Sequence, residues 1–204
     1  LLVLAGGGAW CAPPAEFPSW GRPGPMGATE VSFCWQDEVR QRQVPVKIYL
    51  PVEGRGPFPV VLVSHGLGGS RDGYAYLGRH LAGHGYAVVH LQHKGSDREI
   101  FTKPRGSLQE KARNAVTVVN MLNRPLDLRF ALKQLERLNR EDPSLKGRLD
   151  LARTGAVGHS FGAFTVLAVA GLGLPPPLGR YVNLADPRIR AVVAMSSPVP
   201  GQNW

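Results

Sequence analysis

The sequence predicts an α/β fold with a mostly parallel sheet, and three observations support this prediction. Short apolar runs, typical of strands buried on both faces, alternate with segments in which apolar residues recur at helical spacing. A pair of alternating runs precedes them and indicates an antiparallel start. Glycine-rich turns follow two of the buried runs, at the sheet edge where open α/β sheets bind their ligands. A chain of 204 residues is long enough for one such domain.

The first half of the chain provides the antiparallel pair and two buried strands. Residues 30–36 and 43–50 alternate apolar and polar side chains and are separated by a polar turn, as in a hairpin. Residues 59–64 (PVVLVS) and 86–91 (YAVVHL) are continuous apolar runs. Between them, residues 74–82 have helical periodicity that ends at glycines, so we expect a helix that connects two parallel strands.

Two further helices are predicted after the second buried strand. The first has an apolar face made of Ala112, Ala115, Val116 and Val119. The second has an apolar face made of Leu128, Ala131, Leu132, Leu135 and Leu138. Pro125 is expected near the start of this second helix, where the N–H that proline lacks has no helical partner anyway.

The last part of the chain repeats the strand–helix–strand pattern. A third buried strand is expected near 153–158, followed by a helix of small residues at 161–171. A loop at 174–186 contains three consecutive prolines, and a fourth buried strand is expected at 190–195. The predicted architecture is a mostly parallel central sheet flanked by helices.

The charge balance does not indicate nucleic acid as a partner. The chain has 24 Lys and Arg against 15 Asp and Glu, which gives a net charge of +9. Many of the basic residues lie within 94–153, but acidic residues are interspersed with them, as on solvated helix faces. Since no stripe of aromatic and basic side chains is present, we predict no nucleic-acid partner.

The N-terminus predicts export. Residues 1–12 (LLVLAGGGAWCA) are apolar, but they are shorter than the ~20 residues that a membrane-spanning helix needs. We interpret them as the remnant of a secretory signal peptide, and we expect a secreted or periplasmic protein with no stable membrane span. Residues 13–28 are rich in proline and glycine and are expected to be a linker, which leaves 29–204 as the folded domain. Cys34 is then its single cysteine, so no internal disulfide is expected.

Residues 158–162, Gly-His-Ser-Phe-Gly, match the G-x-S-x-G pattern that presents a serine for nucleophilic attack. The pattern alone is weak, because glycine and serine are common. Here a buried strand precedes it and a helix follows it, which is the context that a sharp nucleophile turn requires. We therefore predict that Ser160 is a catalytic nucleophile.

A second motif, His-Gly-Leu-Gly-Gly at residues 65–69, follows the first buried parallel strand. Its backbone amides are expected at the same sheet edge as Ser160. The N–H groups of Leu67 and of Phe161 are the predicted donors to the oxyanion of a tetrahedral intermediate. The loop lacks the Gly-Lys-Ser/Thr ending of a phosphate-binding loop.

With both motifs, the sequence resembles the α/β-hydrolase superfamily, and within it the dienelactone-hydrolase-like and platelet-activating-factor-acetylhydrolase-like members. The residues that carry the resemblance are 60–97 (VVLVSHGLGGSRDGYAYLGRHLAGHGYAVVHLQHKGSD) and 158–164 (GHSFGAF). It covers about residues 44–200 and implies a serine esterase or lipase that needs no cofactor. The resemblance also implies that Ser160 is the nucleophile and that Leu67 and Phe161 are the oxyanion donors.

The other members of a catalytic triad are not evident. In these hydrolases the acid and then the histidine follow the serine along the chain, yet no histidine follows His159. Asp186 is followed by proline and is expected to begin a turn, and Ser196 occupies the position where the resemblance places an acid. We therefore expect that the acid and the histidine are not in this chain. The fold would then be truncated after the strand that follows the nucleophile helix.

The upstream histidines are expected to play other roles. The resemblance gives His65 a structural role, and the side chain of His159 should point away from that of Ser160. His80 and His84 have the i, i+4 spacing of metal ligands, but no third ligand is apparent and surface histidines are expected. The sequence therefore predicts neither a metal nor a cofactor.

The predicted function is hydrolysis of a carboxylic ester, from a small molecule or a lipid, through an acyl-enzyme on Ser160. Two alternatives remain open. One is an acyltransferase that uses the same nucleophile with an alcohol acceptor. The other is a non-catalytic binding protein that has the same fold but lacks the base. The oligomeric state is not predicted by the sequence.

Overall fold

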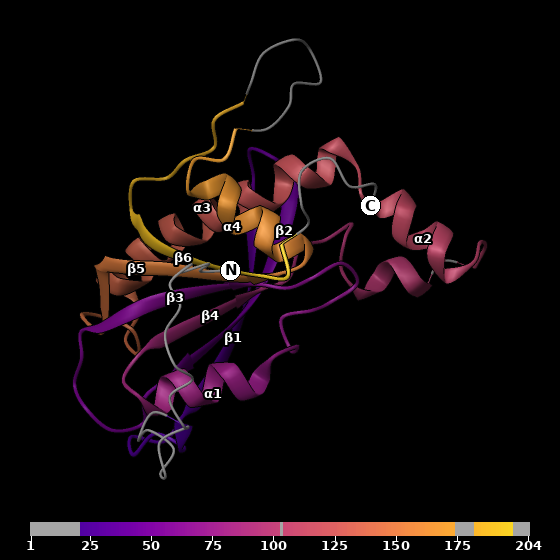
Figure 1. Cartoon of the computed structure of the whole chain (residues 1–204). Coiled ribbons are helices and arrows are strands. Elements are labelled where there is room, and N and C mark those ends of the chain that lie inside the picture. The colour runs from indigo at the N-terminus through magenta and orange to yellow at the C-terminus, as the bar shows by residue number, and fades with distance from the viewer. Residues whose placement is uncertain (1–20, 103, 174–181, 198–204) are drawn as a thin grey trace, which may run out of the picture.

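The computed structural model describes residues 21–102, 104–173 and 182–197, which form a six-stranded sheet in the order β1-β2-β4-β3-β5-β6 (Figure 1). The strands are β1 (Thr29–Asp37), β2 (Arg42–Leu50), β3 (Phe58–Ser64), β4 (Ala87–Leu91), β5 (Leu149–His159) and β6 (Ile189–Met195). β1, β2 and β4 pair antiparallel, whereas β4, β3, β5 and β6 are parallel to one another. The prediction of a mostly parallel sheet with an antiparallel start is therefore confirmed.

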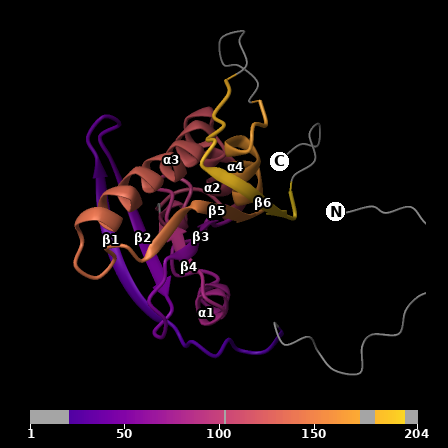
Figure 2. The ribbon, with the colours of Figure 1, turned by 90° about the vertical axis from the view of Figure 1, so that its left-hand side faces the viewer.

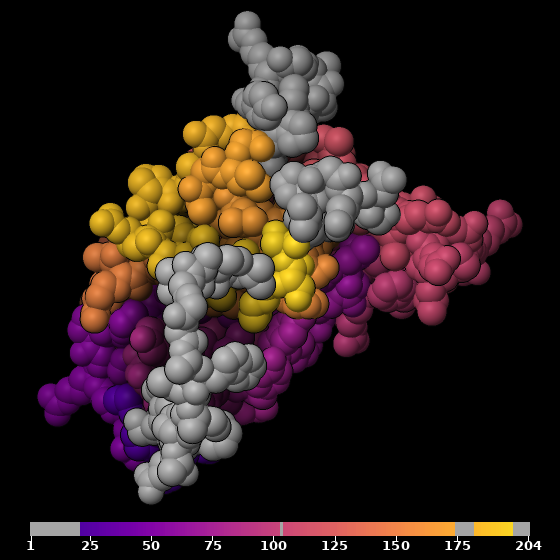
Figure 3. Space-filling view, viewed as in Figure 1, coloured from indigo at the N-terminus to yellow at the C-terminus, as the bar shows by residue number. Residues whose placement is uncertain are grey.

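The helices lie on both faces of the sheet. They are α1 (Ala75–Gly83), α2 (Leu108–Ala115), α3 (Val118–Glu141) and α4 (Phe161–Val169), with a short 3₁₀ helix, η2 (Arg98–Thr102), before α2. α1 covers one face, and α3 and α4 cover the other (Figures 1 and 2). α2 projects from the body of the molecule, as the space-filling view shows (Figure 3). None of the helices within the described ranges is both long and apolar enough to cross a membrane.

The main hydrophobic core lies between the sheet and α3. It contains fully buried side chains from both layers, among them Val46, Ile48, Leu62, Val89, Leu128, Leu132, Leu135 and Val166. β4 and β3 lie side by side at the centre of the sheet. The predicted burial on both faces is confirmed for β4, whereas Pro59 and Val61 of β3 are only partly buried. This core fixes the carboxyl ends of β3 and β5 next to each other, where the two glycine motifs lie.

Two predictions for the helical segment are wrong. The expected apolar face from Ala112 to Val119 is divided between two helices, because Thr117 adopts an extended conformation and its hydroxyl caps Asn120 N–H at the start of α3. Pro125 lies inside α3 rather than near its start. α3 begins at Val118, seven residues before Pro125, because Thr117 caps it there.

The N-terminal segment is described only from residue 21 onward. The predicted signal remnant and residues 13–20 of the predicted linker therefore lie outside the described residues. Met26 N–H donates to the carbonyl oxygen of Gly83 at 3.1 Å, at the end of α1. The side chain of Met26 also packs against the main core, so residues 21–28 lie on the domain.

Candidate active site

Ser160 lies in a strained turn between β5 and α4. Its backbone angles are φ 53° and ψ −118°, a region that residues other than glycine rarely adopt. The turn places Ser160 at the carboxyl end of the parallel strands, and the residue is half-buried rather than enclosed. Among the described residues, no hydrogen-bond partner is present for its hydroxyl. The turn therefore leaves Ser160 partly accessible at the edge of the sheet.

The two glycines of the motif have a steric role. A Cβ at Gly158 would overlap the carbonyl oxygen of Gly162, and a Cβ at Gly162 would overlap the carbonyl oxygen of Ser64. Only glycine therefore allows β5, α4 and the end of β3 to approach as closely as they do. The motif is explained by this close packing around Ser160.

The His-Gly-Leu-Gly-Gly loop lies directly against the Ser160 turn. A Cβ at Gly66 would be 3.5 Å from the Cβ of Ser160, so the backbone of the loop is in contact with the serine. Gly68 N–H donates to Ser96 O at 2.9 Å, which holds the far side of the loop. Leu67 N–H has no acceptor within the part of the chain that the structure describes. Phe161 is the first residue of α4, and its N–H lies at the helix N-terminus, where partial positive charge collects. Phe161 thus follows Ser160 directly, and the loop that carries Leu67 lies next to it at Gly66.

His65 is the first residue of the 65–69 loop, called the oxyanion loop below because it carries the predicted donor Leu67, and both of its ring nitrogens form hydrogen bonds with the backbone. Its Nδ1 lies 2.6 Å from Gly66 O, and its Nε2 accepts a hydrogen bond from the backbone N–H of His93. A neutral ring that donates from Nδ1 satisfies both contacts. Burial, followed by the nearby charge of Arg124, holds the pKa of His65 well below its usual value. His65 therefore has no free nitrogen with which to accept a proton from Ser160.

His159 is adjacent to the nucleophile but binds a different partner. Its Nδ1 lies 2.9 Å from the hydroxyl of Tyr74, and this contact lies beside the backbone of Gly66. No hydrogen bond joins it to Ser160 among the described residues.

A second Ser–His–Asp arrangement lies beneath the loop. Ser64 Oγ is 2.9 Å from His93 Nε2, and His93 Nδ1 is 2.9 Å from Asp127 Oδ2. All three residues are at most 1% exposed, so an ester substrate does not reach Ser64. Burial raises the pKa of Asp127, but the hydrogen bonds from His93 and Arg42 outweigh burial and hold this pKa at about 2. The hydrogen bonds that join Ser64, His93 and Asp127 therefore lie in the interior of the protein.

Sequence analysis did not identify Arg124, which connects this interior network to the oxyanion loop. The residue is completely buried, and its guanidinium donates to Ser64 Oγ and to the carbonyl oxygen of His65. One signal in the sequence could have indicated it. Arg124 and Asp127 lie on the same helical face as Leu128 and Ala131, and a charged pair on an apolar face must be paired in the interior.

Two other sequence candidates lie away from the reacting centre. Asp186 forms a two-point ion pair with Arg188, and its N–H donates to Val169 O, at the opposite end of α4 from Ser160. The rings of His80 and His84 are 4.7 Å apart on α1. No group of three or more metal-ligating side chains occurs within the described ranges.

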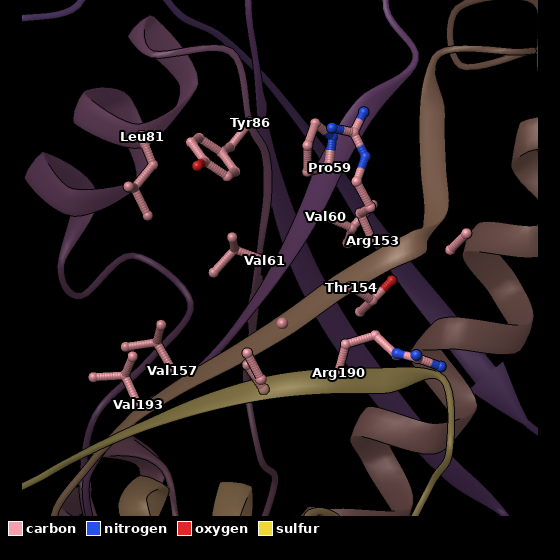
Figure 4. A pocket seen from close by; sticks show the side chains of 14 residues that line it. Pro59, Val60, Val61, Leu81, Tyr86, Arg153, Thr154, Val157, Arg190 and Val193 are labelled. Atoms are coloured by element: carbon pink, nitrogen blue, oxygen red, sulfur yellow. The ribbon is translucent and has the colours of Figure 1, made fainter.

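A groove on the sheet face lies away from the Ser160 turn. It has a volume of about 760 Å³ and lies on the sheet face beside α1, where Val61, Val157 and Val193 form its floor and Leu81 and Tyr86 border it (Figure 4). Its walls come from the middle of β3, β5 and β6 rather than from their carboxyl ends. Ligands of open α/β sheets bind at the carboxyl ends, so the groove is an exposed sheet face and not the reacting site.

The buried histidines predict that acid destabilises the fold. Burial lowers the pKa of His90 and of His93 to about 4, whereas in the unfolded chain these groups titrate near 6.5. Between these values the unfolded state binds more protons, so stability is complete above pH 6.5 and falls as the pH drops toward 4. We expect a loss of roughly 2 kcal/mol per histidine at pH 5. Urea unfolding at pH 7.5 and pH 5 measures it.

The variant His90→Asn provides a control for this pH dependence. Asparagine retains a donor for Gly73 O, which His90 Nδ1 contacts at 3.0 Å, and it removes one titrating group. The decrease in the urea midpoint between pH 7.5 and pH 5 should be smaller in this variant. If the urea unfolding midpoint of the wild type is the same at pH 7.5 and pH 5, the rings of His90 and His93 are not kept neutral in the folded state.

Comparison with known proteins identifies proteins that are similar in sequence to this chain. A family profile described as platelet-activating factor acetylhydrolase, isoform II, matches residues 29–120. The platelet-activating factor acetylhydrolase of Cavia porcellus is 26% identical over 183 residues, which cover 72% of this chain and 42% of that protein. The enzyme of the same name from Canis lupus familiaris is 26% identical over 156 residues, covering 57% and 33%. The chain thus spans less than half the length of the curated relatives it matches.

A solved structure shows the same fold. A Klebsiella pneumoniae protein assigned to the dienelactone hydrolases superposes with a TM-score of 0.60 at 18% sequence identity. The match covers 86% of this chain and 63% of that one. The six-stranded sheet with helices on both faces is therefore the α/β-hydrolase fold, as the resemblance in the sequence implied.

Proposed function

We propose that this chain, whose fold is that of the α/β-hydrolases and whose sequence is similar to platelet-activating factor acetylhydrolases, belongs to a serine hydrolase of carboxylic esters. One observation carries the proposal. Ser160 is held with a positive φ at the end of β5, with the backbone of Gly66 packed against its Cβ. Such strain at a sheet edge is typical of a nucleophile turn, and an ordinary strand–helix turn does not require it.

The proposed reaction has two halves. Ser160 Oγ attacks the ester carbonyl carbon, the hydroxyl proton passes to a general base, and negative charge develops on the carbonyl oxygen. The N–H groups of Leu67 and Phe161 stabilise that charge, and the alcohol leaves with the proton. Water then attacks the acyl-enzyme by the same route and releases the carboxylic acid. No step requires a cofactor.

The general base is proposed to come from outside these 204 residues. His65 and His93 use their ring nitrogens in interior hydrogen bonds, and His159 binds Tyr74. A histidine and an acid that follow the serine along the chain would match the order in α/β-hydrolases. The relatives are longer than the part that this chain matches, which is consistent with that source.

The substrate is proposed to be a small-molecule or lipid ester, in line with the acetylhydrolase relatives. We also propose that the protein is secreted or periplasmic. The apolar residues 1–12 support this location, and they lie outside the described residues.

A fluorophosphonate probe tests the proposal on the full-length protein. We expect one covalent adduct, and peptide mapping should place it on Ser160. Ser64 is the competing candidate, because it has a histidine partner. Ser160→Ala should abolish labelling, whereas Ser64→Ala should still be labelled at Ser160. An adduct on another residue, or labelling that persists in Ser160→Ala, would refute the nucleophile.

The same preparation separates hydrolysis from its alternatives. Chromogenic esters of increasing acyl length should release their alcohol and a free carboxylic acid. If added alcohols receive the acyl group in preference to water, the protein is an acyltransferase. If the folded full-length protein neither reacts with the probe nor cleaves esters, it is a non-catalytic binding protein.

A further inference from the structure

Arg124 makes an unusual set of contacts for a buried cation. Its side chain is 0% exposed, and none of the hydrogen bonds that it makes with the described residues goes to a carboxylate. Nε donates to Thr165 Oγ1 at 2.9 Å and Nη1 to Ser96 Oγ at 2.9 Å. Nη2 donates to Ser64 Oγ at 3.2 Å and also to the carbonyl oxygen of His65. The guanidinium therefore joins four segments of the chain at one point.

Two of these contacts hold the oxyanion loop. The carbonyl oxygen of His65 belongs to the peptide unit immediately before the one that carries Leu67 N–H. On the other side of Leu67, Gly68 N–H donates to Ser96 O at 2.9 Å, and the Ser96 hydroxyl accepts from Arg124. The loop is thus tied to one guanidinium on both sides of the predicted donor.

The remaining contacts reach the other predicted donor. Thr165 Oγ1 accepts from Arg124 Nε and donates to Phe161 O at 2.8 Å. The guanidinium carbon also lies 4.5 Å from the centre of the Phe161 ring, within the range of a cation–π interaction. Arg124 therefore contacts the residue whose N–H is the second predicted oxyanion donor.

We propose that Arg124 is a positioning residue that fixes the distance and orientation between the Leu67 and Phe161 amides. The inference rests on the proposed function. Arg124 does not touch the substrate; it acts through the backbone of the loop on one side and through the first turn of α4 on the other. The two amides stabilise the transition state only if they already point at the position where negative charge develops. They must therefore be held rigidly.

The chemistry of the side chain supports a positioning role. Taking a guanidinium out of water is costly, and replacing buried ionic groups with apolar residues of similar size is often neutral for stability or increases it. The charge is balanced indirectly, through Ser64 and His93 to the carboxylate of Asp127. The guanidinium of arginine is planar, and its N–H donors point in fixed directions. It can therefore bind several acceptors at set angles, whereas the flexible side chain of lysine does not.

The test compares Arg124→Met with a matched control, Arg148→Met, in the full-length protein. Arg148 also lies over a phenylalanine ring, that of Phe58, and also donates to a backbone carbonyl, that of Pro51, but it lies at the opposite edge of the sheet. We expect kcat for ester hydrolysis to fall by about 10–100-fold in Arg124→Met, because a displaced donor acts mainly on the transition state. KM should change by less than about 3-fold, and Arg148→Met should keep both constants close to those of the wild type.

A second pair of variants covers the case in which Arg124→Met does not fold. Thr165→Val and Ser96→Ala each remove one contact of the guanidinium, and each should lower kcat several-fold with KM retained. Arg124→Lys should recover part of the activity, since it keeps the charge and one donor.

The outcomes separate this inference from the proposed function. If the wild-type protein reacts with neither the fluorophosphonate nor esters, the proposed function fails before any variant is made. If the wild type is active and folded Arg124→Met, Thr165→Val and Ser96→Ala all keep wild-type kcat, the positioning role is wrong. A change confined to KM, or an equal loss in Arg148→Met, would also overturn it.

Discussion

Ester hydrolysis by the full-length protein is expected to fall by at least about 10⁴-fold in kcat when Ser160 is replaced with alanine. The variant lacks the oxygen that forms the acyl-enzyme, so only binding and the oxyanion donors remain to accelerate attack by water. The substitution removes one half-exposed hydroxyl for which the described residues provide no hydrogen-bond partner. We therefore expect the urea unfolding midpoint to stay close to that of the wild type. Steady-state hydrolysis of a chromogenic ester measures the effect.

Ser32→Ala is the matched control, because Ser32 is exposed on β1, far from the Ser160 turn. It should keep both activity and stability. A Ser160→Ala protein that retains a tenth or more of the wild-type kcat would exclude Ser160 as the nucleophile. A variant that loses activity together with its cooperative unfolding transition would instead indicate a structural role.

Gly162→Ala is expected to have the largest effect on the fold itself. The added methyl group would overlap the carbonyl oxygen of Ser64 and lie 2.9 Å from that of His65. Both oxygens are backbone atoms at the end of β3, so they move only if the oxyanion loop or α4 moves with them. We expect a destabilisation of about 3 kcal/mol or more. In the fraction that folds, kcat should fall by about 10²-fold, because the donors are displaced relative to Ser160.

Gly155→Ala tests whether the effect of Gly162→Ala depends on its position. Gly155 lies in the middle of β5, and a Cβ there would be 3.3 Å from the carbonyl oxygen of Ala191, a tight contact that a small shift relieves. Its unfolding midpoint in urea should change far less than that of Gly162→Ala. Equal destabilisation by the two variants would mean that the close approach of α4 to β3 has no special importance.

Features that depend on local sequence were predicted well. The buried runs at β3 and β4 and the hairpin of β1 and β2 follow from periodicity over a few residues. The Ser160 turn was predicted because G-x-S-x-G, a preceding strand and a following helix are all readable locally. The structure adds the reason for both glycines, which is contact with the backbone of α4 and of β3.

Features that depend on contacts between distant segments could not be predicted. Arg124 meets His65 across 59 residues of sequence, and His93 meets Asp127 across 34. No short pattern specifies such pairs, because they form only when the sheet register brings β3, the loop after β4 and α3 together. The boundary between α2 and α3 was missed for a different reason, because the contact that sets it is local. Thr117 acts as a cap there, although the apolar pattern continues through it.

A crystal structure of the full-length protein after reaction with a phosphonate ester would test the central claim most directly. The phosphorus stands in for the tetrahedral carbon of the intermediate, and one of its oxygens stands in for the oxyanion. We expect a covalent bond from phosphorus to Ser160 Oγ, with the phosphonyl oxygen about 2.7–3.1 Å from the nitrogens of both Leu67 and Phe161. A phosphonyl oxygen that contacts neither amide, or phosphorus bound to a different residue, would contradict it.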